Sequence, residues 1–356
     1  MTAGGRVPVA ALRGFAAAAF RAVGLAPVDA DESADLLATT DAMGVHTHGT
    51  KLLAGYLRKL KGGGYDPGAR PRIEREGPAW AILDGASSLG QIGCLQAVRT
   101  AIDKARACGI AYVGLRNTGH IGAAGQYAAL AAREGLIAMV AGNDIPSVAA
   151  PGSCRAVLGS NPIAYGIPVA GGDPILLDIA TAAVAGGKVY AALQRGERIP
   201  PTWLIGPDGH PTCDGSLYPQ QASLAPMAGH KGYGFGLWCE VLSAVLPAGH
   251  STWQVGSWIF DEPSRPSWHN AAFTVIDVGQ LTPRGEFDAR LRRLIDELHA
   301  APPAEGTQGV ELPGEREWRW LRRSEADGIE LPADVRLKLR EAAAVAELPL
   351  PEWCAG

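Results

Sequence analysis

The feature that most limits the fold of this chain is an alternation of strand-like and helix-like segments that begins near Arg72. Short apolar runs are typical of buried strands, whereas apolar residues that recur every three or four positions are typical of helices. These patterns predict strands over residues 79–83, 110–115, 136–141, 174–179 and 271–278, and helices over about 95–105, 123–134, 232–245 and 288–300. Such alternation favours an α/β core.

Both ends of the chain carry helical patterns instead. Apolar residues recur at helical spacing over residues 9–23, and a glycine follows as a stop signal. A second helix is expected to start at Asp29, which with Glu32 has the spacing of a capping box. A third is expected over residues 50–61. Residues 305–356 are charged and partly helical, and we expect them to pack back on the N-terminal helices.

Charge and cysteine usage narrow the class of protein. The 356 residues include 32 basic and 36 acidic side chains, and they contain no long block of like charge, which argues against a nucleic-acid-binding platform. Six cysteines without CxxC spacing predict free thiols in a reducing compartment rather than disulfides or a zinc site. A signal-peptide layout and a membrane-length apolar run are both missing, so a soluble cytoplasmic protein is expected.

The first motif with possible chemistry is Gly44-Val-His-Thr-His-Gly49, between two expected helices. Packing alone does not explain a loop that holds His46, Thr47 and His48. One alternative is a helix cap with two solvated histidines. Another is a metal site built on the two histidines, but no nearby carboxylate or cysteine completes a familiar ligand spacing. The sequence predicts no metal.

The second motif, Asn117 to Gly125, follows an expected strand and opens a helix. Glycines before a helix allow a ligand to approach closely, and free N–H groups there suit phosphate. The segment is not a GxGxxG fingerprint, because its first two glycines bracket His120 and the later acidic partner is missing. His120 would nevertheless lie at the carboxyl end of a strand, where α/β proteins bind ligands.

Further polar segments follow. Asn161 precedes a proline, so we expect an extended backbone that presents Ser160 and Asn161 in a fixed direction, although either could be a satisfied turn residue. Asp178 ends an apolar run and is expected to be buried with a partner. His230 and Lys231 begin a glycine-rich helix, where a lysine would suit a cofactor phosphate.

Taken in order, six motifs resemble the type 2 malate/L-lactate dehydrogenase family. This non-Rossmann group includes sulfolactate, ureidoglycolate and diketogulonate dehydrogenases and cyclic imino acid reductases. The similarity runs from about Val9 to about Leu331. The motifs are G-V-x-S/T-H-G at 44–49, N-x-x-H-x-G-A-A at 117–124, L-G-S/T-N-P at 158–162, D-x-A-T at 178–181, H/Y-K-G-Y-G at 230–234 and P-G-E at 313–315.

The resemblance implies an architecture and an assembly. It implies an α/β fold with a mixed-sheet, non-Rossmann NAD(P)-binding domain plus a helical domain formed by both chain termini. In this chain the helical domain would comprise residues 1–72 with 300–356, and the cofactor-binding and catalytic domain residues 73–299. The family also implies homodimers with sites near the subunit interface, a small-molecule substrate, and neither nucleic acid nor a membrane as partner.

The resemblance also implies a reaction, in which hydride passes between NAD(P)H and a carbon bearing oxygen or nitrogen. His120 would be the acid/base for a carbonyl substrate, and an imidazole of near-neutral pKa would suit that step. His48, with Thr47, would be the proton donor for an imine, as in a cyclic imino acid reductase. Ser160, Leu52 and Tyr56 would line the substrate site.

The dinucleotide would contact three segments by the same resemblance. These are His120, Ile121, Gly122, Ala123 and Ala124; Asp178, Ile179 and Ala180; and His230 with Lys231. NADPH is slightly preferred over NADH, because the last pair offers neighbouring groups for an extra phosphate. Both could equally serve the pyrophosphate.

The chain departs from the family at the position of a substrate-binding arginine. Leu52 stands five residues after Thr47, where members usually have an arginine that can grip a carboxylate. The departure implies an atypical substrate with an apolar, amidated or esterified end, with tryptophans 253, 258 and 268 as candidate walls. Alternatively, Lys51, Lys188 or a partner subunit supplies the charge. A cofactor-binding protein without the usual activity, and a metal-assisted hydrolase using His46, His48 and His120, are the remaining alternatives.

Overall fold

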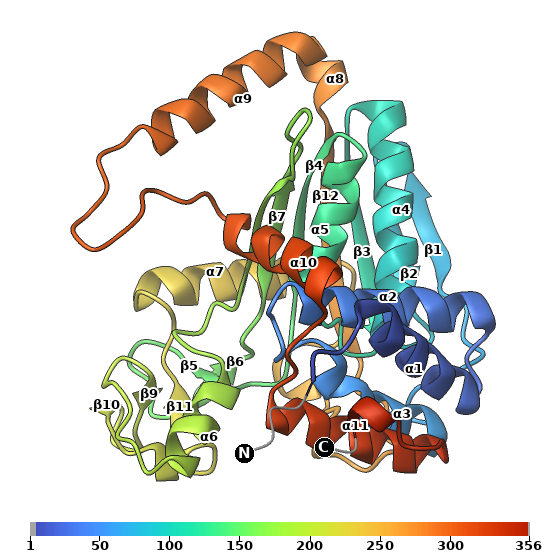
Figure 1. Cartoon of the computed structure of the whole chain (residues 1–356), viewed down its shortest axis with the longest axis vertical. Coiled ribbons are helices and arrows are strands. Elements are labelled where there is room, and N and C mark those ends of the chain that lie inside the picture. The colour runs from blue at the N-terminus through green and yellow to red at the C-terminus, as the bar shows by residue number, and fades with distance from the viewer. Residues whose placement is uncertain (1–4, 355–356) are drawn as a thin grey trace.

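The computed structural model describes residues 5–354 and shows a helical part beside a large mixed sheet, with a smaller sheet below (Figure 1). The helices are α1 (Val9–Ala22), α2 (Pro27–Ala42), α3 (Leu53–Gly62), α4 (Gly90–Cys108), α5 (Ala124–Arg133), α6 (Gly186–Gln194), α7 (His230–Glu240), α8 (Val278–Leu281), α9 (Arg284–His299), α10 (Glu315–Asp327) and α11 (Ala333–Ala346). Short 3₁₀ turns lie at Thr50–Leu52, Gly215–Leu217, Thr252–Gln254 and Glu352–Cys354, and a π-helical turn at Val241–Val245 continues α7.

The helical part is built from both chain ends, as expected. Leu12 and Phe20 of α1, Leu57 of α3 and Leu339 of α11 are all buried in one apolar core. Figure 1 shows α11, at the C-terminal end of the chain, beside α3 and α1 near its start. The helix expected to start at Asp29 instead begins at Pro27, whose fixed φ suits the first helical position, so the capping-box prediction is wrong.

The large sheet has seven strands in the order β1-β2-β3-β12-β4-β7-β8. Their bounds are β1 (Arg72–Gly77), β2 (Trp80–Asp84), β3 (Ile110–Thr118), β4 (Leu136–Gly142), β7 (Ile163–Ile167), β8 (Ile175–Ile179) and β12 (His269–Asp277). Only β2 and β3 pair in parallel, so the sheet is mixed. β12 lies between β3 and β4 although it is last in the chain, and its Phe273 is fully buried.

The smaller sheet has the order β10-β9-β11-β5-β6 and was not predicted. Its strands are β5 (Val148–Ala149), β6 (Ala156–Leu158), β9 (Leu204–Ile205), β10 (Pro211–Thr212) and β11 (Ser223–Leu224). Strands of two or three residues are too short to show an alternating pattern. They are held together by a separate core that includes Val148, Val189 of α6 and Leu204.

The polar helix α9 lies largely outside these cores. Ile295 is its one buried residue in the described part of the chain, and Figure 1 shows α9 leaning away from the large sheet. In contrast, α10 returns to pack on α2. Within residues 5–354, no helix is both long enough and apolar enough to cross a membrane.

Candidate active site

His120 lies in the loop between β3 and α5, at the centre of a cluster of aromatic rings. Its Nδ1 is 2.8 Å from the hydroxyl oxygen of Tyr56 in α3. Its ring stacks on Trp258, with 4.7 Å between centroids, and the centroid of the His48 ring is 6.0 Å away. The fold therefore brings His48, Tyr56 and His120 together, although they come from separate segments.

Burial keeps the histidines of this cluster neutral. Loss of water, reinforced by the charges of His269 and His48, lowers the pKa of His120 to about 3. Burial likewise lowers the pKa of His48, against the opposing pull of Asp178 and Asp144. The expectation of a near-neutral pKa for His120 is thus wrong for the free protein. Anionic groups that enter the site would raise it.

Tyr56 fixes the orientation of His120. Its side chain is fully buried, and burial raises its pKa well above the usual value, so the hydroxyl keeps its proton. Its oxygen can therefore accept a hydrogen bond from Nδ1–H of His120. With the ring proton on Nδ1, the Nε2 atom keeps its lone pair and is the nitrogen free to exchange a proton with a bound molecule.

The other loop histidine, His46, belongs to a structural network. Its Nδ1 is 2.9 Å from a carboxylate oxygen of the buried Asp41, which also accepts hydrogen bonds from the backbone N–H and the hydroxyl of Thr50. Thr47, by contrast, places its hydroxyl oxygen 3.0 Å from Nδ1 of His48. Across residues 5–354, no group of three or more histidines, cysteines or acidic residues is arranged so that it could hold a metal ion.

The segments expected to bind a dinucleotide lie next to one another. The backbone N–H of Gly125 donates to a carboxylate oxygen of Asp178 at 2.7 Å. A Cβ on Gly125 would lie 2.9 Å from Cβ of Asp178, so only glycine allows this approach. Asp178 is exposed as a residue, which corrects the expectation of burial, although loss of water around its carboxylate raises its pKa.

The segment that begins α7 with His230 and Lys231 is joined to the Asp178 segment through backbone contacts. Met227 donates to the carbonyl of Thr181, and Pro226 bridges to Ala182, which places the start of α7 beside the end of the Asp178 segment. His230 and Lys231 are exposed in the first turn of α7, where no described side chain caps the helix. Uncapped N–H groups and a lysine suit the phosphates of a dinucleotide, so the residues present fit this cofactor.

Ser160 borders the same region, but its neighbour differs from expectation. Asn161 has φ of 25° and is not extended, so that prediction is wrong. Its amide nitrogen donates to the carbonyl of Gly236 at 3.0 Å and to Glu240 at 2.7 Å, and these contacts stabilise the unusual backbone. Asn161 is therefore structural, whereas Ser160 stays partly exposed.

A hydrogen-bonded chain in the site was missed by the sequence analysis. The buried His269, at the start of β12, lies 3.0 Å from Asp144 through Nε2 and 2.9 Å from the hydroxyl of Ser267 through Nδ1. Ser267 in turn contacts the hydroxyl of Tyr65, which accepts a hydrogen bond from the backbone N–H of His120. The sequence feature that could have indicated these two residues is their position at the ends of strands: Asp144 follows one strand, and His269 begins another.

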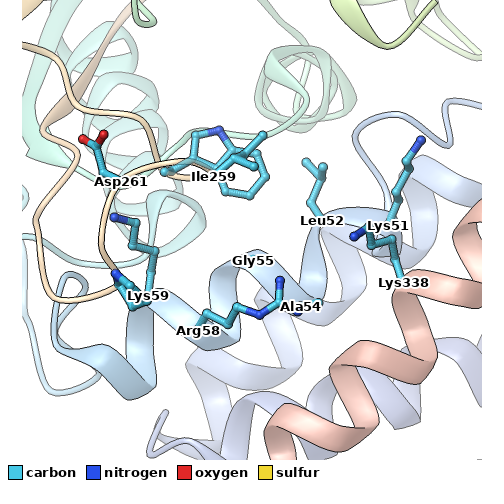
Figure 2. A pocket seen from close by; sticks show the side chains of 11 residues that line it. Lys51, Leu52, Ala54, Gly55, Arg58, Lys59, Ile259, Asp261 and Lys338 are labelled. Carbon is cyan, nitrogen blue, oxygen red and sulfur yellow. The ribbon is translucent and has the colours of Figure 1, made fainter. Parts of the chain in front are cut away.

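A cavity of about 180 Å³ is lined by Trp258, whose ring also stacks on His120. Figure 2 shows Leu52, Arg58 and Ile259 around this cavity. Leu52 lines this cavity together with Trp258 and Ile259. Lys51 also borders it, but its amine donates to Asp334 at 2.6 Å. Lys51 is thus engaged in an ion pair toward α11. Of the other two tryptophans considered as walls, Trp253 is largely exposed and Trp268 stacks on His250.

The fold places His48, Tyr56 and His120 together beside a glycine-bearing loop at the start of α5. The sequence profile of malate/L-lactate dehydrogenase matches residues 7–340. Malate dehydrogenase of Pyrococcus abyssi is 34% identical over 345 residues, covering 95% of this chain and 94% of that protein. A Δ1-pyrroline-2-carboxylate/Δ1-piperideine-2-carboxylate reductase of Pseudomonas putida is 30% identical over 337 residues, covering 94% of this chain and 96% of that protein.

Solved structures agree with these matches. Malate dehydrogenase of Entamoeba histolytica superposes with a TM-score of 0.90 at 28% identity, covering 97% of this chain and 99% of that one. Sulfolactate dehydrogenase of Methanocaldococcus jannaschii superposes with a TM-score of 0.89 at 30% identity, covering 97% of this chain and 98% of that one. The chain belongs to the malate/L-lactate dehydrogenase family. It is therefore an oxidoreductase of the NAD(P)-dependent dehydrogenase and reductase class.

Proposed function

We propose that this enzyme transfers hydride between NAD(P)H and the carbon of a ketone or 2-hydroxy acid, with His120 as the proton-transfer residue. The contact between Tyr56 and His120 carries the proposal, because it orients one imidazole nitrogen and leaves the other free. A bound nicotinamide supplies the hydride. In the reductive direction, Nε2 of His120 gives a proton to the carbonyl oxygen, and in the oxidative direction it takes one from the hydroxyl.

The proposed substrate site combines Ser160, Tyr56 and Leu52. Leu52 stands where relatives are expected to carry a carboxylate-binding arginine, and it borders an apolar wall formed by Trp258 and Ile259. Because Lys51 is paired with Asp334, it is poorly placed to replace that arginine. We therefore propose a substrate that is less acidic than malate at the end that would contact Leu52.

Reduction of a cyclic imine is the second candidate, and the charge around His48 favours it. Asp178 and Asp144 both act to raise the pKa of His48, against the effect of burial. Two carboxylates near a histidine stabilise its protonated form, which is the form that can protonate an imine nitrogen. In this version His48, supported by Thr47, is the donor and His120 assists.

The proposed cofactor contacts are the three adjacent segments at residues 120–124, 178–180 and 230–231. We propose NADPH over NADH, because His230 and Lys231 are exposed and neighbouring groups at a helix start. Comparing the dissociation constants of both reduced cofactors for wild type and Lys231→Ala tests this choice. Selective loss of NADPH affinity supports it, and equal losses place Lys231 at the pyrophosphate instead.

We also propose a homodimer that forms through the outer face of α7 and its π-helical continuation. Phe235, Trp238 and Val245 are 49%, 51% and 58% exposed, and an apolar face of this kind is typical of an interface. The same helix begins with His230 and Lys231, so the interface would adjoin the cofactor segment. Sedimentation of wild type and Trp238→Glu tests it, with a shift toward monomer expected for the variant.

The function itself is tested by following the absorbance of NADPH and NADH with a panel of 2-oxo acids, ketones and cyclic imines. Turnover of a carbonyl compound supports the first candidate, and turnover limited to imines supports the second. Cofactor binding without turnover of any compound would favour a protein that has lost the usual activity.

A further inference from the structure

Asp144 places a carboxylate in the candidate active site that the sequence analysis did not single out. It follows β4, and its Oδ1 accepts hydrogen bonds from the backbone N–H of Ile145 at 2.8 Å and from Nε2 of His269 at 3.0 Å. Because His269 is fully buried, this contact holds the carboxylate in one orientation. Within residues 5–354, Oδ2 accepts no hydrogen bond, and 26% of the side chain is exposed.

The chain of hydrogen bonds behind His269 has a consistent direction. The hydroxyl of Tyr65 can donate to Ser267, Ser267 to Nδ1 of His269, and Nε2 of His269 to Asp144. Tyr65 at the same time accepts from the backbone N–H of His120. Every donor in this chain has an acceptor when Asp144 is ionised, and the chain ties the carboxylate to the loop that carries His120.

The charge of Asp144 reaches several groups near the ring cluster. It opposes the burial that lowers the pKa values of His48 and His120. Burial raises the pKa of Tyr218 to about 12, with further contributions from Tyr190 and Asp144. Burial would raise the pKa of Asp144 itself, but its hydrogen bonds with His269 and with the backbone N–H of Ile145 help to lower it. Asp144 is therefore an anion close to His120, because the ring of its partner His269 lies 5.6 Å from that of His120, centroid to centroid.

Two lysines that line the cavity beside Trp258 are engaged elsewhere. Lys51 pairs with Asp334, and Lys59 donates to the carbonyls of Glu262 and Arg265. Leu52 occupies the position where an arginine would otherwise contribute a positive charge. A second carboxylate, Asp178, lies on the same side as His48 and interacts with it. The site thus carries negative charge where a dicarboxylate substrate would need positive charge.

We propose that Asp144 is a specificity-determining residue, which favours a substrate bearing an ammonium or other hydrogen-bond-donating group a few bonds from the reacting carbon and rejects one bearing a second carboxylate there. The inference rests on the proposed function, because it concerns the same site. Like charges in a partly buried site repel strongly, whereas an ammonium at Oδ2 gains a charged hydrogen bond. His269 is the positioning residue that orients this carboxylate.

Three N-substituted oxamates test the proposal, because they share the carboxylate and carbonyl of a 2-oxo acid but cannot accept hydride. They are N-(2-aminoethyl)oxamate, N-propyloxamate and N-(carboxymethyl)oxamate, which end in an ammonium, a methyl and a carboxylate. Each is titrated into the full-length protein loaded with NADPH or NADH, and binding is followed by calorimetry. For wild type we expect the ammonium compound to bind about tenfold more tightly than the propyl compound, and the carboxylate compound about tenfold more weakly.

Variants assign this ranking to Asp144. In Asp144→Asn, all three affinities should fall within about threefold of one another, whereas Asp144→Glu should keep the wild-type order. Asp208→Asn removes the same charge from the exposed turn between β9 and β10, and it should leave the order unchanged. Should the asparagine variant fail to fold, Asp144→Ser removes the carboxylate and retains an acceptor for the N–H of Ile145.

Two results would overturn the proposal, and they are distinguishable. An order that Asp144→Asn leaves unchanged, or a wild type that binds the carboxylate compound most tightly, contradicts the role of Asp144 while the proposed function stands. Failure of cofactor-loaded wild type to bind any of the three oxamates contradicts a 2-oxo acid site altogether, and the proposed carbonyl reaction falls with the inference.

Discussion

The hydroxyl oxygen of Tyr56 lies 2.8 Å from Nδ1 of His120, and this contact links the helical part of the protein to the glycine-bearing loop after β3. Helix α3 and this loop are separated by more than fifty residues of sequence, so the fold alone brings them together. The contact brings a side chain of α3 to the loop that carries the proposed proton-transfer residue.

Tyr56→Phe is expected to lower kcat by about twofold to tenfold, because a buried hydrogen bond contributes about 0.5–1.5 kcal/mol. His120 would lose the hydrogen-bond partner that fixes its orientation. Tyr112→Phe is the matched control: its hydroxyl donates to the carbonyl of Leu242, away from the site. Steady-state assays should find the loss of kcat in the first variant alone. Equal kcat values for both variants would mean that Tyr56 has no part in the reaction.

The low pKa of His120 predicts a flat pH profile for oxidation. Because burial lowers this pKa to about 3, the ring is already unprotonated and able to accept a proton from about pH 5 to about pH 8. We therefore expect kcat/KM for hydroxy acid oxidation to show no inflection from His120 in that range. An inflection near 6.5 that disappears in His120→Asn would show that the free enzyme has an ordinary histidine there.

The same low pKa values affect stability. The folded chain resists protonation of His48 and His120, whereas the unfolded chain takes up protons below the ordinary histidine pKa of 6.5. The free energy of unfolding should therefore be highest above that value and fall as the pH drops toward 3. Urea titrations at several pH values check this, and His120→Asn should reduce the slope. A slope equal to that of wild type would contradict buried, neutral His120.

Gly55 allows Trp258 to stack over the site. A Cβ at Gly55 would lie 2.7 Å from the Trp258 ring, so Gly55→Ala should displace the ring and cost about 1–3 kcal/mol of stability. Gly14→Ala is the control, because a Cβ there meets open space, and removal of a helical glycine should stabilise by about 0.5–1 kcal/mol. The midpoint temperature of thermal unfolding should fall for Gly55→Ala and rise for Gly14→Ala. A gain in both variants would refute the close packing at Gly55.

Leu52→Arg tests whether the missing arginine sets the substrate. A guanidinium at this position should improve kcat/KM for malate, because charged hydrogen bonds contribute about 1.5–3 kcal/mol. Wild type should use malate, lactate and pyruvate poorly. If wild type already turns these over at about 10⁴ M⁻¹s⁻¹ or faster, the argument from Leu52 is wrong.

Local sequence patterns were enough to predict the long helices and strands, but not which strands lie side by side in the sheet. The apolar run at residues 110–115 indicated β3, and the helical repeat at residues 95–105 indicated α4. The insertion of β12 between β3 and β4 depends on pairing across more than a hundred residues, which periodicity does not encode. The small sheet escaped prediction because its pairing, rather than any run of apolar residues, creates its strands.

The residues of the candidate site also fall into two groups: those that local sequence motifs indicate and those that only the fold brings together. His48 and His120 stood out because each lies in a polar motif that packing does not explain. Asp144 and His269 are 125 positions apart, and neither is unusual until the fold places their side chains 3.0 Å apart. Asp178 was expected to be buried because its strand is apolar, but β8 is an edge strand, and its end is open to solvent.

The central claim is that His120 moves the proton in a nicotinamide-dependent reaction, and one comparison tests it most directly. Wild type and His120→Ala are assayed with the best substrate from the panel, and the dissociation constant of the reduced cofactor is measured for both. The account predicts that kcat falls by about two to four orders of magnitude while cofactor affinity stays within a few fold. An unchanged kcat, or activity and cofactor affinity that fall together, would contradict it.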